Sequence, residues 1–206
     1  MRRAFRPPPR TGPLRAPLYW LGQIGPGSLL LSRVQVDHHF ADIDYGDCAL
    51  FDPAGCGDEI ALLQMSACIE NPLTFLDPAH LFVLRGTLAQ GFNVDPGVAE
   101  GYDIFAGPTT IRVAGPIVPA RFEQIAAQLR PVGAESPPPS FPPPALPARY
   151  WRALDRVVAA KRRLHSVAAV ARALHTRRSR VRDRLRLVAL LASLGPRQVV
   201  SCPHRR

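Results

Sequence analysis

The densest group of residues that could do chemistry is the stretch VDHHFADIDYGDC, in which aspartates and two histidines lie close together. Asp37, His39 and Asp42 could bind a divalent metal, because carboxylate and imidazole groups are common metal ligands. Side chains alternate along a strand, so Asp42 and Asp44 would share one face while His38 and His39 point to opposite faces. A solvated acidic turn between two strands explains the same residues more simply. We therefore expect no metal site here.

Signatures of known enzyme classes are absent from the sequence. It contains no G-x-S-x-G, no phosphate-binding P-loop, no H-E-x-x-H and no dinucleotide-binding fingerprint. We expect a protein that is not an enzyme, with no catalytic residues and no cofactor.

Three of the four cysteines lie in the first half of the chain, at Cys48, Cys56 and Cys68. Structural zinc sites use a closely spaced pair of cysteines, which this spacing lacks, so zinc is disfavoured. Two alternatives remain. If the protein is exported, two of these cysteines could form a disulfide; if it is cytosolic, all three are expected to be reduced, buried thiols.

The second distinctive stretch is SVAAVARALHTRRSRVRDRLRL, which places many arginines on an apolar pattern. Val170 and Leu174 form one apolar stripe, and Val181 lies on another. In one uninterrupted helix, Arg177 or Arg178 would fall on the buried seam between them. A break at His175–Arg178 removes this conflict, because a turn puts both side chains in solvent or against phosphate. The pattern therefore predicts two short helices joined by a turn.

Residues ~150–195 resemble the helix-turn-helix domain of bacterial repressors and partition-type DNA-binding proteins. Ala171 occupies the small-residue position where the two helices approach, and Val181 is the buried branched residue of the second helix. The sequence departs from the family at two positions. His175 stands where the family usually has glycine, and Arg184 stands where an apolar residue is common.

The resemblance implies that residues 179–186 form a recognition helix whose N-terminal part enters the major groove. Arg180 and Arg182 would reach base edges, where arginine pairs with guanine. The remaining arginines would contact phosphates, which makes binding strongly dependent on salt. The DNA-binding residues that this interpretation names are Arg177, Arg178, Ser179, Arg180, Arg182 and Arg184.

Positive charge is concentrated in the last third of the chain. Residues 1–135 hold 10 Arg and 14 Asp plus Glu, a formal charge of −4, while residues 136–206 hold 16 Arg plus Lys and 2 Asp, a charge of +14. A GC-rich genome explains much of the arginine excess over lysine, but it does not explain why the excess lies in one part of the chain. The uneven charge indicates a polyanionic partner.

The first part of the chain predicts strands at six segments that are rich in branched and aromatic residues. A helix follows at residues 119–130, where apolar residues recur at helical spacing. We expect an α+β fold: a mainly antiparallel sheet with a packed C-terminal helix, followed by a proline-rich linker and a small all-α basic helical domain. The expected strands are Leu18–Gly22, Leu29–Asp37, Ala41–Gly46, Glu59–Ala67, His80–Val94 and Tyr102–Gly115.

Short motifs in this part of the chain, LYWLG, YGDC, GC, ACIENPL and LRG, occur in this order over residues ~17–132. In that order they resemble a family of uncharacterised proteins from high-GC bacteria. The resemblance implies a fold and no reaction. Many members of that family look exported or membrane-anchored.

The stretch SPPPSFPPPALP divides the two parts, and consecutive prolines favour an extended polyproline II spacer. The domain organisation that we expect is a disordered, basic and proline-rich N-terminus (1–16), an α+β domain of unknown function (17–132), a proline-rich linker (133–148), a basic helical domain resembling a helix-turn-helix (149–196) and a disordered tail (197–206).

The function that these features favour is DNA binding by the helix-turn-helix, with a transcriptional regulator as one form of it and a homodimer as a possible assembly. The alternative is a non-enzymatic surface or exported protein whose arginine-rich tail binds anionic membranes or other polyanions without sequence specificity. No secretion signal and no apolar run long enough for a membrane span stand in the sequence, so we expect a cytoplasmic protein. A start further upstream would favour an exported or membrane-associated one.

Overall fold

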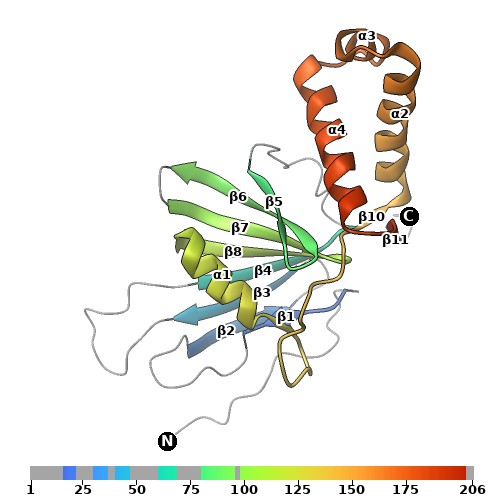
Figure 1. The fold of residues 1–206 in the computed structure, drawn as a ribbon. Helices are drawn as coiled ribbons and strands as arrows, with labels where there is room; N and C mark the ends of the chain where they lie inside the picture. The colour runs from blue at the N-terminus through green and yellow to red at the C-terminus, as the bar shows by residue number, and fades with distance from the viewer. Residues whose placement is uncertain are drawn as a thin grey trace, which may run out of the picture.

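The computed structural model describes residues 16–21, 30–36, 40–46, 60–68, 80–95 and 98–202. Within these ranges the fold is α+β, with a seven-stranded antiparallel sheet and four α-helices (Figure 1). The expected α+β class and antiparallel sheet are therefore confirmed. The predicted disordered N-terminus lies, up to residue 15, outside the described residues.

The seven strands of the main sheet lie in the order β2-β3-β4-β8-β7-β6-β5, and every neighbouring pair is antiparallel. The strands are β2 (Leu30–Val36), β3 (Phe40–Gly46), β4 (Ile60–Ser66), β5 (Leu81–Leu84), β6 (Thr87–Asp95), β7 (Val98–Ala106) and β8 (Thr109–Ile117).

Two of the expected strands are wrong, because each is a hairpin. The segment predicted as His80–Val94 turns at Arg85 and Gly86, whose φ angles are 44° and 86°. Positive φ at both central residues is typical of the two-residue turns that match strand twist. The segment around Tyr102–Gly115 turns at Gly107, which has a φ of 60°. In both segments apolar residues continue on either side of the turn, so the sequence pattern does not show where one strand ends and the next begins.

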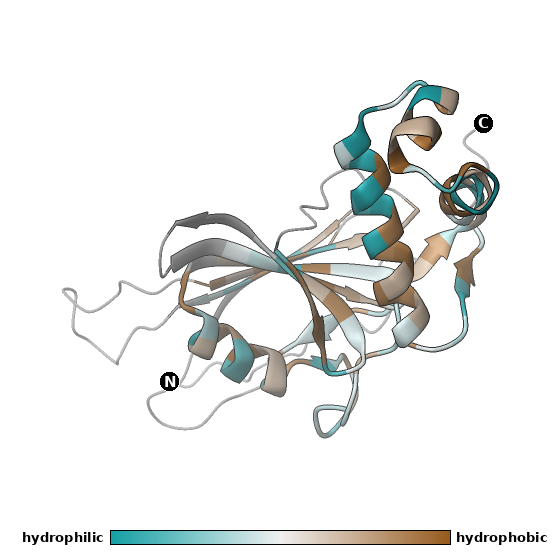
Figure 2. Cartoon of the chain, turned by 45° about the horizontal axis from the view of Figure 1, so that its top comes forward, coloured by the Kyte–Doolittle hydropathy of each residue, from teal (hydrophilic) through white to brown (hydrophobic). Residues whose placement is uncertain are grey.

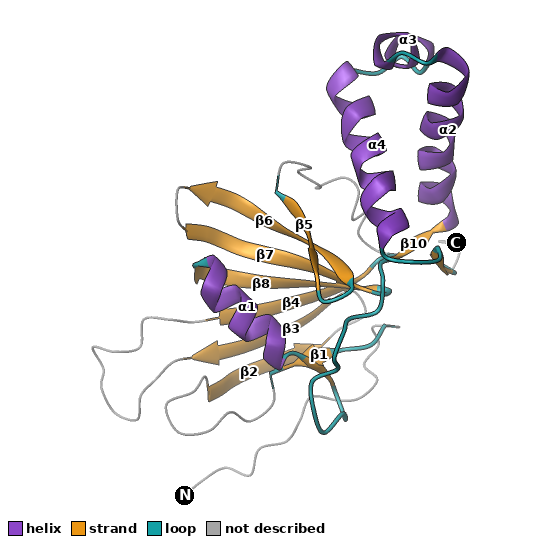
Figure 3. Cartoon of the chain, in the orientation of Figure 1, coloured by secondary structure: helices purple, strands orange, loops and turns teal. Residues whose placement is uncertain are grey.

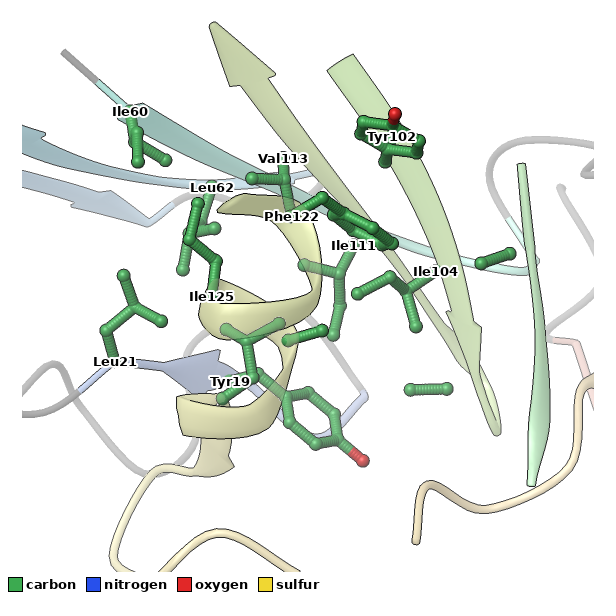
Figure 4. Packing of buried hydrophobic residues seen from close by; sticks show 14 of the residues in the cluster. Tyr19, Leu21, Ile60, Leu62, Tyr102, Ile104, Ile111, Val113, Phe122 and Ile125 are labelled. Carbon is green, nitrogen blue, oxygen red and sulfur yellow. The ribbon is translucent and has the colours of Figure 1, made fainter. Parts of the chain in front are cut away.

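Helix α1 (Pro119–Gln128) covers one face of the sheet and contributes to the main hydrophobic core (Figure 4). Phe122 and Ile125 point from the helix toward the sheet. The Phe122 ring stacks on Tyr102 with 4.0 Å between ring centroids. Leu62, Ile104 and Ile111 supply apolar surface on the strand side and are almost fully buried. The helix predicted at this position is thus confirmed.

The short strand β1 (Tyr19–Trp20) is held to the body by side chains of other strands. The buried Gln64 amide donates to the Tyr19 carbonyl at 2.8 Å and accepts from the Tyr19 N–H at 2.7 Å. The Tyr45 hydroxyl accepts from the Leu21 N–H at 2.9 Å. Burial raises the pKa of Tyr45 to about 12, so this phenol remains neutral at physiological pH.

The proline-rich segment packs against the sheet instead of forming a free linker. Phe141, between the two proline triplets, is 2% exposed and belongs to the main core. Its N–H donates to the Arg85 carbonyl at 2.7 Å, and the Arg85 guanidinium donates to the Pro138 carbonyl. The N–H of Gly107 donates to the Pro142 carbonyl at 3.1 Å. The segment therefore rests on both hairpin turns, which the sequence pattern alone did not predict.

The C-terminal helices α2 (Ala148–Leu164), α3 (Val167–Ala173) and α4 (Arg178–Ser193) follow at the predicted positions. In Figure 3, α2 and α4 run side by side away from the sheet, and α3 lies across their far end. Within the described ranges, none of the helices combines the length and apolar composition needed to cross a bilayer.

One hydrophobic cluster joins these helices to the sheet. Its sheet residues include Leu88 and Phe105, and its helical residues include Trp151, Leu154 and Leu187. Since successive side chains of a strand alternate in direction, Phe105 lies on the opposite face of the sheet from Ile104 and therefore from α1. The helices and the sheet thus share a core instead of forming two separate hydrophobic units.

Residues 197–202 of the tail that was expected to be disordered pack against the rest of the molecule, and residues 203–206 lie outside the described residues. Strand β11 (Gln198–Val200) pairs in parallel with β10 (Ala145–Pro147). The Trp151 indole N–H donates to the Gln198 carbonyl at 2.9 Å. Arg197 forms two hydrogen bonds with the Asp155 carboxylate, at 2.6 and 3.0 Å. A tail that was expected to be free is thus fastened to the base of α2.

A disulfide between Cys68 and Cys202 connects this tail to the end of β4. Cys68 was expected in a disulfide or as a buried thiol, but Cys202 was not among its expected partners. Cys48 and Cys56 lie outside the described residues. The 134-residue separation of the bonded cysteines explains why local spacing could not reveal the pair.

Replacing Phe141 tests the docking of the proline-rich segment. We expect Phe141→Ala to lower the free energy of unfolding by about 3–5 kcal/mol, because it leaves a cavity in a closely packed core. Ser140→Ala, at the exposed neighbouring position, serves as the control and should change stability little. Chemical denaturation monitored by tryptophan fluorescence measures both. Equal stability of the two variants would contradict the packing described here.

Removing the disulfide tests the attachment of the tail. We expect Cys202→Ser to lower the free energy of unfolding by about 3–5 kcal/mol, because the bond closes a long loop and restricts the unfolded chain. A thiol reductant should destabilise the wild type more than the variant, by about the same amount. Ser201→Ala is the matched control. If the reductant does not change the wild-type denaturation curve, the bond does not form.

Candidate nucleic-acid interface

The turn between α3 and α4 has the geometry of a Schellman motif. The Thr176 N–H donates to the Ala171 carbonyl at 2.9 Å, and the His175 N–H donates to the Arg172 carbonyl at 3.2 Å. His175 has a φ of 46°, the left-handed conformation that favours glycine. The predicted break in the helix is therefore confirmed, and His175 takes the backbone conformation expected of glycine at this position.

The three C-terminal helices are held in place by a small core of their own. Val157 of α2, Val170 and Ala171 of α3 and Val181 of α4 are buried together. Ser166 caps α3, because its hydroxyl accepts from the Ala169 N–H at 3.5 Å. The small side chain of Ala171 lets α3 approach its neighbours closely. This core fixes the direction in which α4 leaves the turn.

An open depression of about 890 Å³ lies at the junction of α3 and α4. Alanines form part of its lining, and the other residues that line it are basic or polar. The N-terminal end of α4, where backbone N–H groups have no partner within the helix, lies at the same place. The lining residues are Ala168, Ala171, Arg172, His175, Thr176, Arg177, Arg178 and Arg180.

The predicted DNA-binding residues are all exposed to solvent. None of their guanidinium groups forms an ion pair within the part of the chain that the structure describes. Asp183 is the single acidic residue of α4, and it is only partly exposed. In Figure 2 the C-terminal helices show hydrophilic and hydrophobic residues alternating along their lengths. The outer surface of α4 therefore carries a large uncompensated positive charge.

The structure does not bring the predicted residues together on one surface. Arg177, Arg178 and Arg180 line the depression, whereas Arg182 and Arg184 do not. Because each residue advances a helix by about 100°, Arg180 and Arg182 lie about 200° apart around α4. The two arginines expected to read bases together therefore point in different directions.

Two further arginines lie beside the predicted ones, one at the depression and one on the side of α4 that carries Arg182. Arg172 lines the depression from α3. Arg186 is exposed one helical turn after Arg182 and on the same side of α4. Arg186 could have been predicted from the sequence, because it follows Arg182 at helical spacing. Arg172 could not be found by spacing, because its place depends on the angle between two helices.

The acidic stretch considered as a metal site is described only in part. Asp42 and Asp44 lie on one face of β3, as expected, and both are partly buried. Asp37, His38 and His39 lie outside the described residues. No cluster of three or more metal-ligating side chains occurs within the described ranges. The buried Asp103 carboxylate accepts from Arg112 at 2.8 and 3.0 Å and from Gln90 at 3.0 Å, an arrangement that suits a structural role.

No family model, no curated protein and no solved structure matches the chain.

Two alanines of α3 test whether its packing positions α4. We expect Ala171→Leu to lower the free energy of unfolding by about 1–3 kcal/mol, because the larger side chain does not fit the buried contact between helices. Ala173→Leu makes the same change at an exposed position of the same helix and should have little effect. Thermal denaturation followed by circular dichroism compares them. Equal melting temperatures would contradict the close approach of the helices.

Proposed function

We propose that the chain binds double-stranded DNA through α3 and α4, with α4 entering the major groove. The observation that carries this proposal is the exposed first half of α4. Its cationic side chains form no ion pair with any of the described residues, and they stand at the end of the molecule far from the sheet (Figure 1). An α-helix with its side chains is about 10–12 Å wide, and the major groove of B-DNA is about 12 Å wide.

The arginines along α4 and those at the depression suit different parts of the duplex. Arg178, Arg182 and Arg186 recur at every fourth position and form the outward face of α4, which we call the α4 face; Arg178, at its start, also lines the depression. Arginine in the major groove pairs with the O6 and N7 atoms of guanine, and Arg182 lies near the centre of this face. Arg172 and Arg180, at the depression beside the helix N-terminus, suit contacts with phosphate oxygens.

The attachment of the helices to the sheet suggests how the sheet contributes to DNA binding. Trp151 and Leu187 are buried against sheet residues, so the sheet holds α2 and α4 at a fixed angle. A bound partner of the sheet would then act on the same rigid body that carries the α4 face. This is the arrangement expected of a regulator whose first part senses another molecule.

Selection of duplexes from a random pool tests the proposal, and the full chain is used because the helices share a core with the sheet. We expect an enriched sequence, and we expect Arg182→Ala to weaken binding to it by about tenfold or more, the loss of one arginine–guanine pair. Arg180→Ala should weaken binding to all duplexes alike and reduce its dependence on salt.

Arg121→Ala, an exposed arginine on α1, is the control and should bind as the wild type does. The proposal fails if the wild type does not retain duplex DNA near physiological salt. If the protein retains duplex DNA but no sequence is enriched, then α4 does not read bases, and the protein contacts only the phosphates.

A second candidate function is supported by the Cys68–Cys202 disulfide. Disulfides persist in oxidising compartments and are rare in the cytosol, so this bond favours an exported or surface-associated protein. In that setting the arginines would bind anionic phospholipid headgroups or other polyanions without sequence specificity. Vesicles that contain phosphatidylserine distinguish the two functions. Binding to vesicles in preference to duplex DNA at equal salt would favour this second function.

A further inference from the structure

We infer that the outward face of α2 is a second binding surface for a DNA backbone, so that one molecule holds two separate duplex segments. This inference rests on the proposed function, in which the first duplex occupies α3 and α4. The surface consists of Arg149, Arg152, Arg156 and Arg163, which we call the α2 stripe.

Helical spacing brings these four arginines onto one side of α2. Residues three, four and seven positions apart lie within about 60° of one another around a helix. Trp151 and Leu154 lie on the other side and are buried in the cluster shared with the sheet and α4. All four side chains of the α2 stripe are exposed, and the stripe borders the contact with α3 only at Ala160, which is buried between Arg156 and Arg163.

The charge of the α2 stripe is not compensated by acidic neighbours. None of its guanidinium groups has an ion-pair partner within the described residues. Asp155 is the one carboxylate of α2, and it is already bound by Arg197. The hydrogen bonds from Arg197 lower the pKa of Asp155, which keeps this carboxylate ionised and engaged. The stripe thus retains its full positive charge.

The α2 stripe and the α4 face point to opposite sides of the helical unit. The buried sides of α2 and α4 meet in shared clusters. The α4 face lies roughly opposite the buried side of α4, and Arg149 and Arg152 lie roughly opposite Leu154, the α2 residue that is buried in one cluster with Leu187 of α4. Two packed helices with their side chains span about 20 Å. A straight duplex seated on the α4 face therefore cannot also lie along the α2 stripe.

The shape and composition of the α2 stripe suit a phosphate backbone better than a membrane. From Arg149 to Arg163 the helix extends about 21 Å, close to the length of six base pairs of duplex. Helices that lie in a membrane surface insert an apolar face. The large apolar side chains of α2 are instead turned into the protein, and the exposed large apolar residues of the described chain, Val83, Val118 and Val199, lie elsewhere.

A bridging experiment tests this inference with the full oxidised chain. One duplex is fixed to beads, and capture of a second, fluorescent duplex is measured in the presence of protein. Binding to a single duplex is measured separately by fluorescence anisotropy. The variant carries Arg149→Gln, Arg152→Gln, Arg156→Gln and Arg163→Gln, which remove the charge and keep good helix formers at exposed positions.

We expect the wild type to capture the second duplex, and sedimentation to show one chain with two duplexes. The α2 variant should bind a single duplex within about threefold of the wild-type affinity and capture about tenfold less of the second, since backbone contacts depend on charge. Arg121→Gln, on α1, is the control for loss of charge and should capture as the wild type does. An unchanged circular dichroism spectrum confirms that the α2 variant is folded.

Other outcomes separate the failure of this inference from that of the proposed function. If the wild type binds one duplex but does not capture a second, or if the α2 variant captures as well as the wild type, the inference is wrong and the proposed function stands. If the α2 variant loses single-duplex binding to the same extent as capture, the two surfaces are one site and the inference is also wrong. If the wild type binds no duplex, both fail.

Discussion

The arrangement of the whole molecule depends on the hydrogen bonds between the proline-rich segment and the two hairpin turns. Prolines have no N–H group, so a polyproline strand can only accept hydrogen bonds through its carbonyls. The Arg85 guanidinium and the Gly107 N–H supply donors to Pro138 and Pro142. Phe141 then anchors the segment in the core. These contacts determine where the chain leaves the sheet and hence where α2 begins.

The same attachment separates two parts of opposite charge. The sheet and its loops carry a net negative charge, and the C-terminal helices carry a large positive one. If the helices folded flat onto the acidic part, carboxylates would neutralise some of the arginines. Instead α2 and α4 extend from the sheet and hold α3 away from it (Figure 3). The position of the helices is thus what leaves their arginines available to a polyanion.

Local patterns were sufficient to predict the α+β class, helix α1 and the three C-terminal helices, because each has its own apolar periodicity. They failed where a contact joins distant parts of the chain. Nothing near Phe141 indicates that it belongs to a core formed by strands, and nothing near Cys68 indicates Cys202. At the candidate interface the sequence identified the exposed arginines of α4. It could not place Arg172 beside them, because that depends on the angle between α3 and α4.

The parallel pairing of β10 with β11 brings together the points where the chain enters and leaves the three C-terminal helices, since Pro147 lies beside Val200. An insert whose two ends are adjacent can be gained or lost without changing the path of the rest of the chain. Residues 148–197 have the form of such a cassette. A homologue with a different module in their place would keep the path of the sheet, but that module would also have to cover Leu88 and Phe105, which these helices bury.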